Sequence, residues 1–136
     1  MPTILIVDDR SVNRELLNVL LTSKGHRILE AGDGVEGLKV ARESRPDVIF
    51  SDVMMPHMNG FQFAQELLLY PETADIPVIL TSAYRVSERT EVMAAAYGVK
   101  YVLRVPIEPE VIFKAVDKVL AENTNGHLQR EPSEAC

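Results

Sequence analysis

Short apolar runs alternate five times with longer stretches of helical period along this chain. The short runs are rich in β-branched residues, which is typical of strands. The first, third and fourth runs are almost wholly apolar, as expected of strands buried on both faces of a parallel sheet. The predicted strands are Thr3–Val7, Arg27–Glu30, Val48–Ser51, Val78–Ser82 and Tyr101–Arg104.

Between and after these strands, apolar residues spaced three and four positions apart predict five helices. The first ends by Gly25, the second covers about 35–43, the third about 60–69, the fourth about 87–97, and the last begins near Pro109. The residues expected to form the apolar faces are, for the first helix, Val12, Leu16, Val19 and Leu20; for the fourth, Val92, Met93 and Ala96; and for the last, Ile112, Ala115, Val116 and Val119.

A strand–helix unit repeated five times predicts an α/β fold, namely a doubly wound five-stranded parallel sheet flanked by five helices. Residues 1–122 would form this domain. From Asn123 the composition becomes polar, with one large apolar residue in fourteen. Such a segment buries too little apolar surface to offset the entropy of ordering, so residues 123–136 are predicted to be a flexible tail or linker.

Composition narrows the class of protein. The chain has 136 residues, of which 46% are hydrophobic, and its single cysteine, Cys136, is the last residue. One core can therefore form without disulfides. The N-terminal apolar run is too short for a signal peptide or a membrane span, which predicts a cytoplasmic protein without a membrane partner. The net charge of −6 repels phosphate backbones and disfavours direct binding of nucleic acid.

Polar residues follow the predicted strands at the edge where a doubly wound sheet carries its site. Asp8 and Asp9 follow the first strand, Asp52 follows the third, and Ser82 and Arg104 end the fourth and fifth. Three converging carboxylates repel one another unless a cation lies among them, and ligands that are all oxygen favour Mg²⁺. A carboxylate can also attack phosphorus to form an acyl phosphate, with a hydroxyl such as that of Ser82 holding a phosphoryl oxygen.

Four segments carry a resemblance to a known family: Ile4–Asp9, Asp52–Pro56 continuing to Asn59-Gly60, Ile76–Ile79, and Pro106–Glu110. In this order and spacing, the chain resembles the receiver domain of two-component response regulators over residues 3 to about 121. The resemblance implies a flavodoxin-like strand order of 2-1-3-4-5. It also implies that Asp52 is the phosphoacceptor, that Asp8, Asp9 and Asp52 bind Mg²⁺ together with the backbone carbonyl of Met54, and that the domain assists only its own phosphorylation and dephosphorylation.

The same resemblance implies the partners. A histidine kinase or a histidine phosphotransfer protein would supply the phosphoryl group. The surface formed by the fourth helix, the fifth strand and the fifth helix would contact an output domain or a partner protein. A second copy of the chain is a further candidate partner on the same grounds.

Two family positions require a choice of register. The family has a Ser or Thr about thirty residues after the phosphoacceptor, which indicates Ser82 and leaves Thr81 in reserve. The family lysine precedes a proline after the fifth strand, and alignment on Pro106 places Val105 there.

Counting from Ser82 instead points to Arg104 as a substitute for the lysine, with Tyr101 at the position of an aromatic switch residue. We favour the proline register, in which the lysine is absent. Separately, the resemblance implies a cis peptide before Pro106.

Three other functions are compatible with a fold of this class. A haloacid dehalogenase-type hydrolase needs a second acid two residues after its nucleophile, where this chain has Met54. A flavodoxin-like FMN binder would need a hydroxyl- and glycine-rich loop where this chain has Asp8-Asp9-Arg10. A pseudo-receiver, acting as a binding module with impaired phosphorylation, remains the alternative, because the missing lysine favours it while the intact acids oppose it.

Overall fold

The structure, a computed structural model, describes the backbone of residues 1–134 and the side chains of residues 1–122. Its five strands form one parallel sheet in the order β2-β1-β3-β4-β5, as the resemblance implied. The strands are β1 Thr3–Val7, β2 Arg27–Ala31, β3 Val48–Asp52, β4 Val78–Ser82 and β5 Val99–Arg104. The helices are α1 Ser11–Thr22, α2 Gly34–Ser44, α3 Gly60–Leu67, α4 Glu88–Ala95 and α5 Pro109–Glu134.

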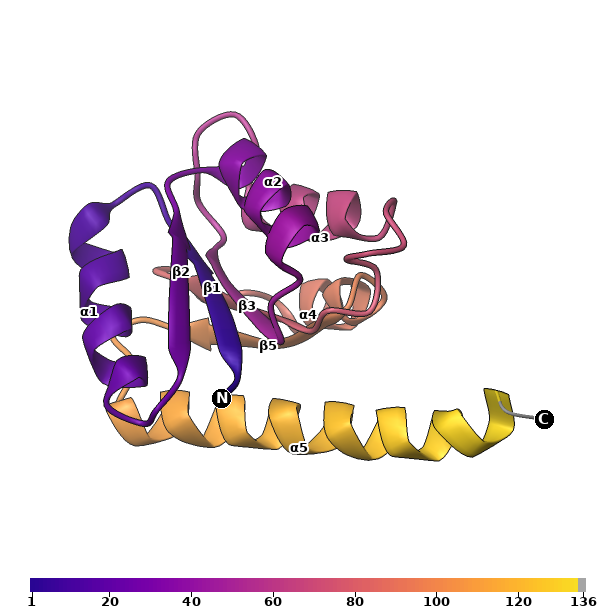
Figure 1. Cartoon of the computed structure of the whole chain (residues 1–136). Helices are drawn as coiled ribbons and strands as arrows, with labels where there is room; N and C mark the ends of the chain where they lie inside the picture. Colours follow the sequence, from indigo (N-terminus) through magenta and orange to yellow (C-terminus); the bar gives the residue numbers. More distant parts are fainter. Residues whose placement is uncertain (135–136) are drawn as a thin grey trace.

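Helices cover both faces of the sheet (Figure 1), and a separate apolar core lies under each face. Neighbouring residues of β1 serve the two cores alternately: Leu5 belongs to the cluster with α2 and α3, and Ile6 to the cluster with α1 and α5. The two largest fully buried side chains, Phe63 and Phe50, also lie one in each core. This arrangement explains why the central strands are continuous apolar runs rather than alternating ones.

The predicted apolar face is correct for α5 and largely wrong for α1. On α5 all four predicted residues are buried. On α1, however, Val12 is 73% exposed, Leu16 61% and Val19 64%. The face that packs on the sheet carries Leu17, Leu20 and Leu21, so only Leu20 of the predicted set contacts the core. The helix has two apolar stripes, and spacing alone does not indicate which of them meets the sheet.

The same error occurs on α4. Val92 and Met93 are exposed, as is Ala96 just beyond the helix, whereas Ala94 is the buried residue of this helix. Ala94 joins the core under α3. A small side chain therefore makes the contact that the sequence pattern assigned to larger ones.

β5, an edge strand, begins two residues earlier than predicted and pairs irregularly with β4. Val78 pairs with Val99, but Ile79 pairs with Tyr101, so Lys100 has no partner in the ladder. Beyond this shift the register is regular and ends with Ser82 opposite Arg104. The irregularity thus sets which β5 residue reaches the end of β4.

At the C-terminus, α5 continues to Glu134, through backbone that the sequence assigned to a tail (Figure 1). The domain boundary at residue 122 and the linker role of the following residues stay predictions. Among the residues that the structure describes, no helix has the length and apolarity needed to cross a membrane.

Candidate acidic site at the ends of the strands

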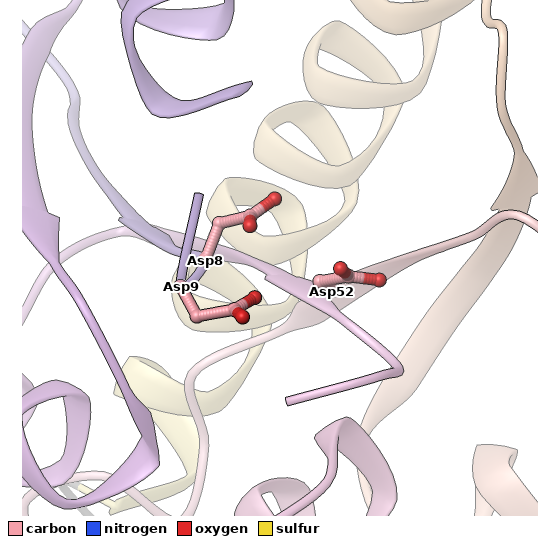
Figure 2. A group of neighbouring side chains, drawn as sticks. All are labelled: Asp8, Asp9 and Asp52. Carbon is pink, nitrogen blue, oxygen red and sulfur yellow. The ribbon is translucent and has the colours of Figure 1, made fainter. Parts of the chain in front are cut away.

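Asp8, Asp9 and Asp52 meet at the carboxyl edge of the sheet, as predicted. β1 and β3 are neighbours, with Val7 opposite Ser51, so the residues that leave the two strands start side by side. Figure 2 shows the three carboxylates gathered around a common space. One oxygen from each lies within 4.8 Å of the others. Three anionic groups are therefore held at a distance that suits a shared cation.

Asp8 is the most firmly held of the three acids. Its side chain is buried, and both carboxylate oxygens accept hydrogen bonds: Oδ1 from the backbone N–H of Arg10 at 2.9 Å and Oδ2 from Nδ2 of Asn13 at 3.2 Å. Nη1 of Arg14 donates to the backbone carbonyl of Asp8 at 2.6 Å. Burial raises the pKa of the Asp8 carboxyl, while these side-chain hydrogen bonds act in the opposite direction.

Asp52 is half-buried and has one carboxylate oxygen engaged. Its Oδ1 accepts a hydrogen bond from the backbone N–H of Met54 at 3.2 Å. Burial raises the pKa of Asp52, and the charges of Asp8 and Asp9 raise it further. Asp9 is exposed, and none of the hydrogen bonds between described residues involves its carboxylate.

These properties fit a hard divalent cation. The donor atoms are all oxygens, and the cluster holds negative charge that no nearby cationic side chain neutralises through an ion pair among the described residues. Burial is the largest cause of the raised pKa of both Asp8 and Asp52; the charge of Asp9 raises both further, and the charge of Asp8 also raises that of Asp52. A bound Mg²⁺ would offset both costs.

The loop after β3 closes tightly beneath Asp52, and glycine is required for it. A Cβ on Gly60 would lie 2.6 Å from the backbone oxygen of Asp52 and 3.0 Å from Cα of Val53. Asn59 caps α3 through a reciprocal capping box with Gln62. In the sequence, Asn59 stood only as part of a family signature, together with Gly60. The Asn-x-x-Gln spacing before a helix was the signal that would have identified the cap.

The hydroxyl groups at the end of β4 are both buried. Thr81 is the register partner of Asp52, and its carbonyl accepts from the N–H of Val53 at 2.8 Å. Oγ of Ser82 donates to the carbonyl of Tyr84 at 2.7 Å and accepts from the Tyr84 N–H at 3.1 Å. In this structure the Ser82 hydroxyl therefore holds the β4–α4 loop.

A cis peptide joins Val105 to Pro106, as the family resemblance implied. The N–H of Val105 donates to the carbonyl of Ser82 at 2.8 Å, and the side chain of Val105 is partly exposed. Arg104 is exposed at the end of β5 and forms no ion pair with any side chain that the structure describes. Tyr101 packs in the core on the α5 side.

Comparison with known proteins places this arrangement in a family. Residues 4–117 match the response regulator receiver domain. The chain belongs to that family. Receiver domains are signalling domains of two-component systems, and their partners are histidine kinases or phosphotransfer proteins.

Individual proteins that are similar to this receiver domain support the family assignment. Protein PilH of Pseudomonas aeruginosa is 36% identical over 89% of this chain and 99% of its own length. The chemotaxis protein CheY4 of Vibrio cholerae shares 32% identity and superposes with a TM-score of 0.82, covering 88% of this chain and 99% of that one.

A receiver domain of a Pseudomonas aeruginosa sensor histidine kinase, described with magnesium coordinated in its active-site cleft, has a TM-score of 0.79. It covers 88% of this chain and 98% of its own, and at 22% identity it shares the fold. Several other curated relatives are much longer: the chain spans 36% of the regulatory protein AfsQ1 of Streptomyces coelicolor and 25% of the response regulator PleD of Caulobacter vibrioides.

Proposed function

We propose that this receiver domain accepts a phosphoryl group on Asp52 from a histidine kinase or a histidine phosphotransfer protein. The observation that carries the proposal is the meeting of Asp8, Asp9 and Asp52 within 4.8 Å at the ends of β1 and β3. Asp52 is the acid best suited to be the nucleophile, because it is half-buried and keeps one oxygen without a hydrogen bond from the described residues.

In the proposed reaction, the free oxygen of Asp52 attacks the phosphorus of a phosphohistidine. The new P–O bond forms as the P–N bond breaks, and the imidazole nitrogen leaves with the bonding electron pair and takes up a proton. Phosphoryl transfer needs positioning and positive charge on the equatorial oxygens more than covalent machinery. The backbone N–H of Met54 and the hydroxyl of Ser82 are the candidates to hold those oxygens, the latter after release from Tyr84.

The metal proposed for this site is Mg²⁺. Asp9 and Asp52 would ligate it directly, Asp8 mostly through water, and the backbone carbonyl of Met54 would complete the protein ligands. When bound, it would supply positive charge to the transferring group. Both carboxylate oxygens of Asp8 already accept hydrogen bonds, which supports a water-mediated contact of Asp8 with the ion rather than direct ligation.

Two surfaces are proposed for partners. Helix α1 begins two residues after Asp9 and carries the exposed side chains of Val12 and Leu16. A donor protein bound to these side chains would bring its histidine to the site. The face of α4, β5 and α5 carries exposed Val92 and Met93 and would contact an output domain or partner protein. A kinase partner of this type places the domain in the cytoplasm.

A pseudo-receiver remains the second candidate, and Val105 favours it. If the lysine position is occupied by valine, no ammonium group reaches the phosphoryl oxygens from that position. The two functions differ in one measurable property, because a pseudo-receiver would not form an acyl phosphate at Asp52.

The test is incubation with acetyl phosphate and Mg²⁺, followed by mass spectrometry and treatment with hydroxylamine, which cleaves acyl phosphates. We expect one labile phosphate on the wild-type protein and none on Asp52→Asn. Asp33→Asn is the matched control, since Asp33 is an exposed aspartate that caps α2 and is not a member of the cluster. Equal labelling of Asp52→Asn and wild type would contradict the proposal, and absence of label on the wild type would favour the pseudo-receiver.

A further inference from the structure

The three acids differ in how many hydrogen bonds hold them. Asp8 has both oxygens occupied, Asp52 has one, and Asp9 has none from the residues that the structure describes. The bond that completes the set on Asp8 comes from Asn13, in the first turn of α1. It is the only side-chain donor to any of the three carboxylates within the described residues.

We propose that Asn13 is a positioning residue for the cation site, which fixes the carboxylate of Asp8 and thereby the placement of the ion. This inference rests on the proposed function, because it assigns a further residue to the same Mg²⁺ site. Asn13 would not touch the ion. Its amide would hold Oδ2 of Asp8 so that the carboxylate keeps one orientation in the empty and in the loaded site.

The surroundings of Asn13 support a role in holding Asp8. The adjacent residue, Arg14, donates from Nη1 to the carbonyl of Asp8 and from Nε to Glu30 at 3.1 Å. The first turn of α1 therefore donates hydrogen bonds to both the backbone and the side chain of Asp8, and Arg14 links that turn to β2 through Glu30. A neutral amide is suited to the side-chain contact, because it donates a hydrogen bond without cancelling the charge that attracts the ion.

If Asn13 served only the helix, its replacement would change the stability of α1 and leave Mg²⁺ binding unchanged. Asparagine is a poorer helix former than alanine, and Asn13 lies inside α1 rather than at its cap. Arg10, the cap residue just before α1, makes no side-chain cap hydrogen bond. Replacing Asn13 by alanine should improve the helix but remove the hydrogen bond to the buried Asp8 carboxylate. The metal-free protein should therefore stay folded with a modestly lower melting temperature, whereas Mg²⁺ binding should weaken.

The experiment is a Mg²⁺ titration of the full chain followed by nitrogen–proton NMR at the backbone amides of Asp9 and Asp52, with thermal unfolding measured without Mg²⁺. For Asn13→Ala we expect the Kd for Mg²⁺ to rise roughly tenfold, as is typical when a residue behind a metal ligand is removed. Asn18→Ala is the matched control. Asn18 is an asparagine of the same helix whose amide donates to Glu30 at 2.9 Å instead of to the cluster, and its loss should change the Kd less than twofold, well below the effect at Asn13.

Three results would overturn the inference: an unchanged Kd in Asn13→Ala, an equal rise in Asn18→Ala, or loss of the folded state in metal-free Asn13→Ala. The first two, obtained with a wild-type protein that binds Mg²⁺, leave the proposed function standing. A wild-type protein whose Asp9 and Asp52 amides do not respond to Mg²⁺ would overturn the proposed function and this inference with it.

Discussion

Asp52→Asn should stabilise the metal-free protein at neutral pH. The substitution keeps the shape of the side chain, and its oxygen can still accept from the N–H of Met54. It removes one of three charges whose oxygens lie within 4.8 Å. At that separation two unit charges repel by about 0.9 kcal/mol in water and about 3.5 kcal/mol at an effective dielectric constant of about 20.

The lower figure applies to the pair with exposed Asp9, and it is a lower bound for the pair with buried Asp8. Two relieved repulsions then amount to about 2 kcal/mol, which corresponds to a rise in Tm of roughly 6 °C for a domain of this size.

The effect should depend on pH in a defined direction. Because burial and the neighbouring acids raise the pKa of Asp52 in the folded state, the folded protein binds this proton more tightly than the unfolded chain. Stability is therefore lost as pH rises from the unfolded pKa, about 3.8, through the raised folded pKa. The variant lacks this loss, so its advantage should be near zero at about pH 3.5 and complete at about pH 7.5.

Differential scanning calorimetry across this pH range, with and without Mg²⁺, measures the effect. Added Mg²⁺ should raise the Tm of the wild type and raise that of Asp52→Asn much less, since binding to the folded state stabilises it. A variant that is less stable than the wild type at neutral pH would refute the reasoning. So would a stability difference that does not change with pH.

Three further predictions follow from the site and its surroundings. Gly60→Ala should cost about 1–3 kcal/mol in urea unfolding because its Cβ would meet backbone atoms, whereas Gly32→Ala, whose Cβ would have only Nη1 of Arg14 within 4 Å, at 3.8 Å, should be close to neutral. Val105→Lys should speed labelling by acetyl phosphate about tenfold, the equivalent of one charge-assisted hydrogen bond, while Arg104→Ala should change it little; the opposite pattern would make Arg104 the working cation. Leu16→Ala should slow phosphotransfer from the cognate kinase and leave acetyl phosphate labelling unchanged. If the variant matched the wild-type rate in both assays, α1 would not be part of the donor surface.

The sequence predicted β1, β3 and β4 well because each is a short, largely apolar run with a polar residue at or just after its end. β1 and β4 have the predicted bounds, and the convergence of the acids followed from the parallel order alone. The face of α1 failed for a physical reason. Val12, Leu16 and Val19 form one apolar stripe and Leu17 and Leu21 another, and the packing of the whole sheet selects the second.

The hydrogen bonds inside the site were harder to foresee than its acids. Asn13 is five residues from Asp8, and only the path of the loop between β1 and α1 brings its amide to the carboxylate. The clearance at Gly60 depends likewise on how closely α3 approaches the end of β3. Such contacts are set by three-dimensional proximity, and no periodicity in the sequence reports them.

The irregular pairing of β5 has a consequence for how copies of this protein can meet. An edge strand with free N–H and carbonyl groups is a template on which a foreign strand can add. Here β5 carries an unpaired Lys100 and ends in the exposed Arg104, while the opposite edge, β2, carries Arg27 and Glu30. Charges at both margins and a break in the ladder oppose growth of the sheet from one molecule to the next. If copies of this protein associate, contacts between helices would form and separate without extending the sheet.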